Sequence, residues 1–260
     1  MDAAPDPDLL ARIRDDGFAV IGRVIDPDTI AVMRTALQRA IDADIARWSG
    51  NPWYQDHWMV HNLMLRDPVF LAFLRNETMH AYLSTLLSPD CILYAYTSSS
   101  LPPHGRNYST RIHIDVQAQS VDCITNVGVL VALDDFTDDN GATAYLPGSH
   151  RRLEAPDAAQ FDAHALRTYP RAGEAVVFNA RTYHRGGVNT TSTARHAISL
   201  NACQRWMKQR FDYPRMLSPG QAEALGPVGR RFAGFDSRVP VSLEQYYVAP
   251  ADRMYKAASQ

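Results

Sequence analysis

The stretch TRIHIDVQ, residues 110–117, alternates polar and apolar side chains, which is the pattern of a β-strand with two unlike faces. Side chains two positions apart leave the same face of a strand. His113 and Asp115 are therefore expected to project together, while Ile112 and Ile114 point the other way. An imidazole beside a carboxylate can bind a metal ion, but the same pair also suits the solvent-facing side of an amphipathic strand. The rest of the chain has to decide between these interpretations.

Short β-like runs fill residues 91–206, and turn-rich stretches such as DDNG, residues 138–141, separate them. Helical patterns come before these runs. One begins with Asp26 as an expected N-cap and Pro27 at the first helical position, and a second covers residues 67–87. Helices followed by many short strands predict a mainly β fold with flanking helices, an antiparallel sandwich or barrel.

The length of 260 residues and the even composition predict a single domain over 1–260. Its expected parts are a helical portion over about 1–90, a barrel core over about 91–206 and a C-terminal cover over 207–260. The N-terminus lacks the charge and hydropathy pattern of a signal peptide, and the chain contains no long apolar run. A cytoplasmic location is therefore expected.

The net charge of −2 comes from 26 basic and 28 acidic residues that are interspersed along the chain. This distribution gives no electrostatic footprint for a nucleic acid or an anionic membrane, so the expected partner is a small molecule. The three cysteines, Cys91, Cys123 and Cys203, lie far apart within apolar segments, which indicates buried thiols.

A second conspicuous segment starts with the strand-like EAVVFNA, residues 174–180, which leads to His184; Arg195 follows eleven residues later. A hairpin would bring His184 and Arg195 close together. Two histidines and one carboxylate leave adjacent metal positions open, which suits ferrous iron that must bind a chelating co-substrate and dioxygen, and also suits zinc. The planar fork of an arginine can grip a carboxylate through two parallel hydrogen bonds.

The segments HID, DDNGATAYLPGSHR and HRGGVNTTSTAR resemble the phytanoyl-CoA dioxygenase-like family of Fe(II)- and 2-oxoglutarate-dependent oxygenases, over roughly residues 15–206. The resemblance implies a double-stranded β-helix, the jelly-roll barrel of the cupins, with iron in its mouth. It also implies that His113, Asp115 and His184 are the catalytic iron ligands, and that Arg195 binds the distal carboxylate of 2-oxoglutarate.

Further site residues are predicted less directly. In similar enzymes a residue near the DDNG turn helps to bind 2-oxoglutarate, which makes Thr143 a candidate, while Arg111 or Tyr96 could contact its 1-carboxylate. Candidate substrate-binding residues lie in two segments outside the barrel strands: His57, Trp58, His61 and His104. The alternative for the first three is an aromatic cluster packed under a loop.

Hydroxylation of a C–H bond in a small, secondary-metabolite substrate is the reaction that the resemblance implies first. Desaturation, cyclisation and epimerisation use the same ligands and stay open, whereas halogenation is disfavoured because related halogenases have Gly or Ala where Asp115 stands. A metal-binding sensor without redox turnover and a zinc hydrolase are the alternatives from other classes. Neither has an obvious need for a carboxylate fork at Arg195. The oligomeric state is left open.

Overall fold

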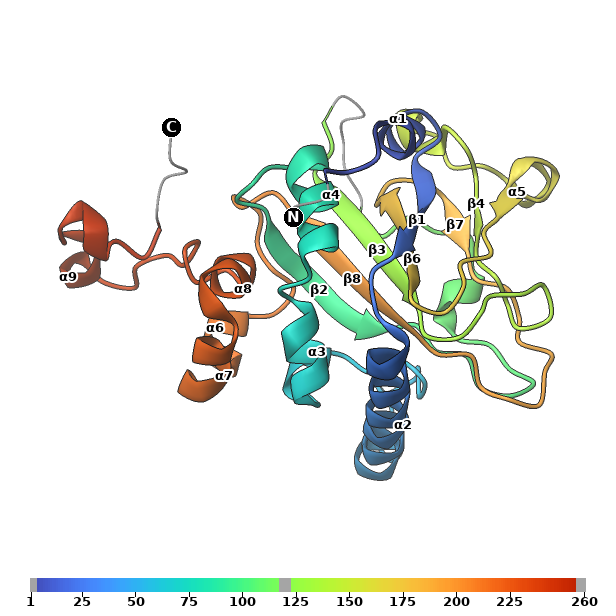
Figure 1. Cartoon of the computed structure of the whole chain (residues 1–260), viewed down its shortest axis with the longest axis horizontal. Helices are drawn as coiled ribbons and strands as arrows, with labels where there is room; N and C mark the ends of the chain where they lie inside the picture. Colours follow the sequence, from blue (N-terminus) through green and yellow to red (C-terminus); the bar gives the residue numbers. More distant parts are fainter. Residues whose placement is uncertain (1–3, 117–122, 256–260) are drawn as a thin grey trace.

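Two antiparallel sheets form the centre of the protein in a computed structural model that describes residues 4–116 and 123–255 (Figure 1). The large sheet has the strand order β1-β6-β3-β8-β2 and the small sheet the order β5-β4-β7. The strands are β1 (Phe18–Arg23), β2 (Ile92–Ser98), β3 (Asn126–Ala132), β4 (Ala144–Tyr145), β5 (Leu166–Arg167), β6 (Glu174–Asn179), β7 (His184–Arg185) and β8 (Ala197–Cys203).

Both faces of the large sheet are buried. Along β3, Val127, Val129 and Val131 join a hydrophobic cluster with the N-terminal helices, whereas Leu130 belongs to a second cluster on the opposite face. Tyr145 of the small sheet joins that second cluster. The two sheets thus enclose a core of their own, which confirms the predicted jelly-roll fold with flanking helices.

Most of the helices lie beside the large sheet, whereas α1 and α5 lie nearer the small sheet (Figure 1). The helix α2 begins as predicted, because the Asp26 side chain accepts a hydrogen bond from the Thr29 backbone N–H and Pro27 is the first helical residue. The helices are α1 (Pro7–Asp15), α2 (Pro27–Trp48), α3 (Pro68–Phe73), α4 (Glu77–Leu86), α5 (Ala158–His164), α6 (Tyr213–Met216), α7 (Pro219–Ala224), α8 (Gly226–Phe232) and α9 (Leu243–Tyr246). Figure 1 shows α2, α3 and α4 on one side of the large sheet, and the C-terminal helices beyond its β2 edge.

The prediction of one helix over residues 67–87 is wrong, because the chain breaks between α3 and α4. Asn76 explains the break. Its side chain caps α4 by accepting from the Met79 N–H, and its amide donates to the carbonyl oxygen of Val24, so the backbone turns there instead of continuing α3.

Residues 110–116, the described part of TRIHIDVQ, do not form a regular strand, so that prediction is also wrong. A short 3-10 helix at Tyr108–Thr110, capped by Asn107, runs directly into this stretch, and His113 makes a single β-bridge with His184. Gln117, its last residue, lies outside the described residues.

Within the C-terminal part, α7 contacts α3 and α8 contacts β2. The described residues contain no helix with the length and hydropathy needed to span a membrane.

Of the three cysteines, Cys91 and Cys203 are buried as predicted. Cys123 is exposed, so the prediction of a buried thiol is wrong for that residue.

Candidate metal centre

The three predicted ligands meet where the two sheets face each other. His113 and His184 form a reciprocal backbone pair, in which each N–H donates to the carbonyl oxygen of the other residue, at 3.1 and 3.0 Å. The N–H of Asp115 donates to the carbonyl oxygen of Ala180 at 2.9 Å. The Asp115 Oδ1 atom then lies 3.7 Å from Nε2 of His113 and 3.6 Å from Nε2 of His184. These three side chains can supply ligand atoms that all lie within 4.8 Å of one another.

Backbone carbonyls fix the orientation of both imidazoles. Nδ1 of His113 lies 2.7 Å from the carbonyl oxygen of Arg111, and Nδ1 of His184 lies 2.9 Å from that of Thr182. A carbonyl can only accept, so each Nδ1 carries the proton and each Nε2 turns a lone pair toward Asp115. Burial, followed by the nearby His184, lowers the pKa of His113 to about 4, which keeps its ring neutral at pH 7. Two imidazole nitrogens and a carboxylate oxygen form a donor set for a divalent transition metal.

Arg195 is a buried cation without a bonded carboxylate. Its exposure is 1%, and its Nε and Nη1 atoms have no hydrogen-bond partner. Asp134 is the carboxylate with the largest electrostatic effect on Arg195. Its two oxygens are already bonded, one to Arg34 and the other to the His196 backbone N–H. The guanidinium lies 4.2 Å above the ring of Phe136, and burial lowers the pKa of Arg195 to about 10. A buried, unpaired guanidinium is costly unless a ligand supplies the missing acceptor.

Tyr145 lies between the metal ligands and this arginine. Its ring stacks on Phe18 at 4.9 Å and on His184 at 5.4 Å, and its hydroxyl is buried without a hydrogen-bond partner. Burial raises the pKa of this hydroxyl well above its usual range, and Asp115 and Arg195 both act on it electrostatically. Three polar atoms, Nε and Nη1 of Arg195 and the hydroxyl of Tyr145, are thus buried without hydrogen-bond partners; Tyr145 lines a cavity at the metal ligands, and Arg195 does not.

Tyr145 was not among the residues predicted from the sequence. Its spacing from the predicted Thr143 indicates a shared role, because alternation on an extended segment places residues two positions apart on one face.

Two cavities meet at His113 and Asp115, and His184 lines the inner one. The inner cavity, about 50 Å³, lies between the sheets, and the outer cavity, about 410 Å³, opens above Asp115. His113, Asp115, Met59, Thr97, Tyr108 and Ser199 line both cavities. Tyr108, also missed from the sequence, has its ring 5.8 Å from that of His113. The centre thus faces two cavities of different size, and Tyr108 lines both.

The candidate 2-oxoglutarate contacts separate in the structure. Thr143 is buried and lines the inner cavity. Arg111 lines the outer cavity, together with His113 and Asp115, and is absent from the lining of the inner one; its predicted contact with the 1-carboxylate stays a prediction. Tyr96 lines neither cavity and does not lie where a 2-oxoglutarate contact would need it. It belongs to the helix-facing hydrophobic cluster, and its ring lies 6.4 Å from that of Phe73.

The four candidate substrate residues are not brought together either. His61 lines the outer cavity. His57 stacks on Tyr54 near the surface, Trp58 lies beside the ring of His196, and His104 is exposed in a loop where its backbone N–H donates to Thr191. These three residues line neither cavity at the ligands.

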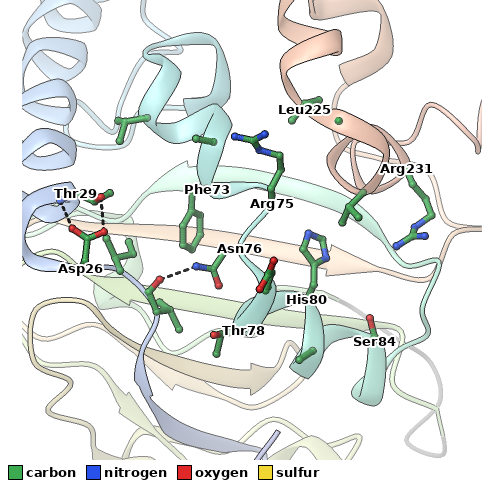
Figure 2. A pocket seen from close by; sticks show the side chains of 18 of the residues that line it. Asp26, Thr29, Phe73, Arg75, Asn76, Thr78, His80, Ser84, Leu225 and Arg231 are labelled. Atoms are coloured by element: carbon green, nitrogen blue, oxygen red, sulfur yellow. Dashed lines mark hydrogen bonds between the residues drawn. The ribbon is translucent and has the colours of Figure 1, made fainter. Parts of the chain in front are cut away.

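A wider groove of about 1070 Å³ lies elsewhere, on the helical side of the large sheet (Figure 2). Its walls come from the start of α2, from α3 and α4, and from α8. Figure 2 shows Arg75, His80 and Arg231 around this groove, and Asn76 bonded to the backbone of the opposite wall. None of the three metal-ligand candidates lines it, so its size does not make it the reaction site.

Comparison with known protein families gives a match to the model of phytanoyl-CoA dioxygenase (PhyH) over residues 13–197. The chain belongs to this family. The matched region includes His113, Asp115, His184 and Arg195. Membership in the PhyH family makes the protein an oxygenase and makes the three clustered side chains a candidate iron site.

The chain is also similar in sequence to curated proteins and in fold to solved structures. An uncharacterized protein of Mycobacterium tuberculosis, Rv1501, is 29% identical over 92% of this chain and 90% of its own length. The dioxygenase trt7 of Aspergillus terreus is 26% identical over 90% of this chain and 85% of its own length. Among solved structures, the non-heme alpha-ketoglutarate-dependent carbocyclase SnoK from nogalamycin biosynthesis matches with a TM-score of 0.63 at 20% identity, over 83% of this chain and 92% of SnoK. The epimerase SnoN, solved with Fe3+ and alpha-ketoglutarate, matches with a TM-score of 0.60 at 19% identity, over 76% and 83%. These structures share the fold with this PhyH-family protein.

Proposed function

We propose that the protein is an Fe(II)- and 2-oxoglutarate-dependent dioxygenase that oxidises a C–H bond of a small molecule of secondary metabolism. The observation that carries the proposal is the combination of a two-histidine, one-carboxylate cluster with a buried, unpartnered Arg195. A zinc hydrolase or a simple metal sensor has no need for that arginine.

His113, Asp115 and His184 would hold the iron. The two Nε2 lone pairs and the carboxylate oxygen converge, and the backbone carbonyls behind each imidazole keep the ligand tautomer in place. Three protein ligands leave positions for a chelating co-substrate and for dioxygen. When bound, ferrous iron with 2-oxoglutarate and dioxygen supplies an oxidant strong enough to attack an unactivated C–H bond.

Arg195, Tyr145 and Thr143 would bind 2-oxoglutarate on the inner side of the centre. Arg195 offers two N–H groups to the distal carboxylate, and the hydroxyl of Tyr145 can donate to the same ligand. Leu130 and Phe178 line this side, so the bound co-substrate is shielded from water. The substrate would enter through the outer cavity, on the other side of Asp115.

Hydroxylation is the reaction that we propose first. Desaturation, cyclisation and epimerisation require the same ligands, and the neighbours SnoK and SnoN carry the names of a carbocyclase and an epimerase. Asp115 occupies the position that a halide would need at the metal, which argues against halogenation.

An anaerobic titration of the metal-free protein with Fe(II) and 2-oxoglutarate tests the proposal. We expect a weak visible charge-transfer band from a 2-oxo acid chelated to ferrous iron, and we expect the band to be absent in His184→Ala. Binding of iron without the band would reject 2-oxoglutarate as co-substrate and favour the sensor or zinc hydrolase.

A further inference from the structure

The rim of the outer cavity carries two arginines without carboxylate partners. Arg111 and Arg210 both line this cavity and are exposed. Nε of Arg111 donates to the carbonyl oxygen of Tyr108 at 3.3 Å, and its guanidinium lies 5.6 Å from the centre of the Tyr108 ring. Arg210 is held through its backbone, whose N–H donates to the carbonyl oxygen of Tyr94 at 3.0 Å. Neither guanidinium forms an ion pair with a carboxylate in the described part of the chain.

Two carboxylates, Asp56 and Asp115, also line this cavity. Asp56 accepts a hydrogen bond from the Tyr108 backbone N–H at 3.1 Å, and Asp115 belongs to the metal-ligand cluster. The two arginines and the two aspartates all line this cavity, and all four act electrostatically on the hydroxyl of Tyr108. Both carboxylates of this cavity thus have a bonded partner or a predicted role at the metal, whereas the two guanidinium groups have no carboxylate partner.

The walls of the cavity supply apolar contact and one free polar atom. Met59, Tyr94 and Tyr108 contribute apolar surface, and the volume of about 410 Å³ is in the range of small-molecule sites. Nδ1 of His61 is buried and has no hydrogen-bond partner. A ligand that enters this cavity therefore meets the side chains of Tyr94 and Tyr108 and two guanidinium groups without carboxylate partners.

We propose that the outer cavity recognises its substrate through an oxyanion, a carboxylate or a phosphate, that Arg210 and Arg111 bind, while a ring or chain of the substrate packs on Met59 and Tyr94. This inference rests on the proposed function and names the substrate class of the same site. Arg111 then serves the substrate and not the 2-oxoglutarate 1-carboxylate. His113 and Asp115, which would hold the metal, line this cavity where it meets the inner one, so the oxidised carbon would lie at that end and the anionic group at the two arginines.

Anaerobic calorimetry on the protein loaded with Fe(II) and 2-oxoglutarate tests the proposal with three probes of one size class: 2-naphthoate, 2-naphthyl phosphate and the neutral 2-naphthamide. Charge-assisted hydrogen bonds from arginine predict that one of the two anions binds at least about tenfold more tightly than the amide. The better anion tells carboxylate from phosphate recognition. The double variant Arg111→Ala/Arg210→Ala is expected to lose this preference, and Arg12→Ala, which removes an exposed arginine on α1, is expected to keep it.

Three results would overturn the inference: equal binding of the amide, a preference that persists in the double variant, or no binding of either anion tighter than about 1 mM. Failure of the proposed function is a separate result, because it shows as absence of the 2-oxoglutarate charge-transfer band before any probe is added. In that case the same titrations on the iron-loaded protein without 2-oxoglutarate still decide whether the arginines bind the anions.

Discussion

Arg195→Met removes the buried guanidinium while keeping a long apolar side chain over Phe136. We expect this change to abolish tight binding of 2-oxoglutarate without destabilising the ligand-free protein. A structural arginine would stabilise the ligand-free protein, whereas a ligand-binding arginine would not. Measuring both 2-oxoglutarate affinity and stability therefore separates the two roles.

The size of each effect follows from the environment of Arg195. Burial lowers its pKa from 12.5 to about 10, and at about 1.4 kcal/mol per pKa unit the charge is disfavoured by about 3 kcal/mol. Methionine does not carry this penalty, so the free energy of unfolding of the ligand-free variant should equal or exceed that of the wild type. Two charge-assisted hydrogen bonds to a carboxylate contribute about 3 kcal/mol or more, so the affinity for 2-oxoglutarate should fall by about 100-fold or more.

Thermal unfolding of the metal-free protein and anaerobic calorimetry of 2-oxoglutarate binding to the Fe(II) form measure these two quantities. Arg171→Met, an exposed arginine between β5 and β6, is the matched control and should change neither. The reasoning is refuted if Arg195→Met binds 2-oxoglutarate within threefold of the wild type, or if its melting temperature falls by several degrees.

Three further predictions follow from other residues. Asp115→Ala should weaken Fe(II) binding by about 10-fold or more, since one of three ligands is lost, and a competitive chelator titration measures this; unchanged affinity would contradict the assigned ligand. Iodoacetamide at pH 8 should modify Cys123 and spare Cys91 and Cys203, because burial raises the pKa of both thiols to about 12, and peptide mass mapping gives the answer. Burial lowers the pKa of His80, so below pH 6.5 the unfolded chain takes up a proton that the folded protein does not; stability should fall with acidification by up to about 1.4 kcal/mol per pH unit, and His80→Gln should reduce this slope in urea unfolding.

Local signals in the sequence were sufficient where the structure is local. Asp26 and Pro27 fixed the start of α2, because an N-cap and a first-turn proline act within one turn of helix. The approach of His113 to His184 followed instead from a motif resemblance, since no local pattern shows that residues 71 positions apart will pair.

Other features depended on details that the pattern does not contain. Alternation gives a period of two but does not show which side chains face the helices and which face the cavities. In addition, the register of β2 against β8 shifts between Leu93 and Ala95. Tyr96 consequently points to the helices, and its neighbour Thr97 lines both cavities. The isolation of Arg195 was also beyond the sequence, because it depends on Arg34 and a backbone N–H occupying Asp134.

The reciprocal backbone hydrogen bonds between His113 and His184 have a consequence for metal choice. They hold the donor atoms in place before any ion arrives, so binding requires little rearrangement of the chain. A preorganised nitrogen and oxygen site follows the Irving–Williams order, in which cobalt, nickel, copper and zinc all bind more tightly than ferrous iron. The protein's geometry therefore does not select iron by affinity. We therefore expect the metal supply of the cell to influence which ion occupies the site.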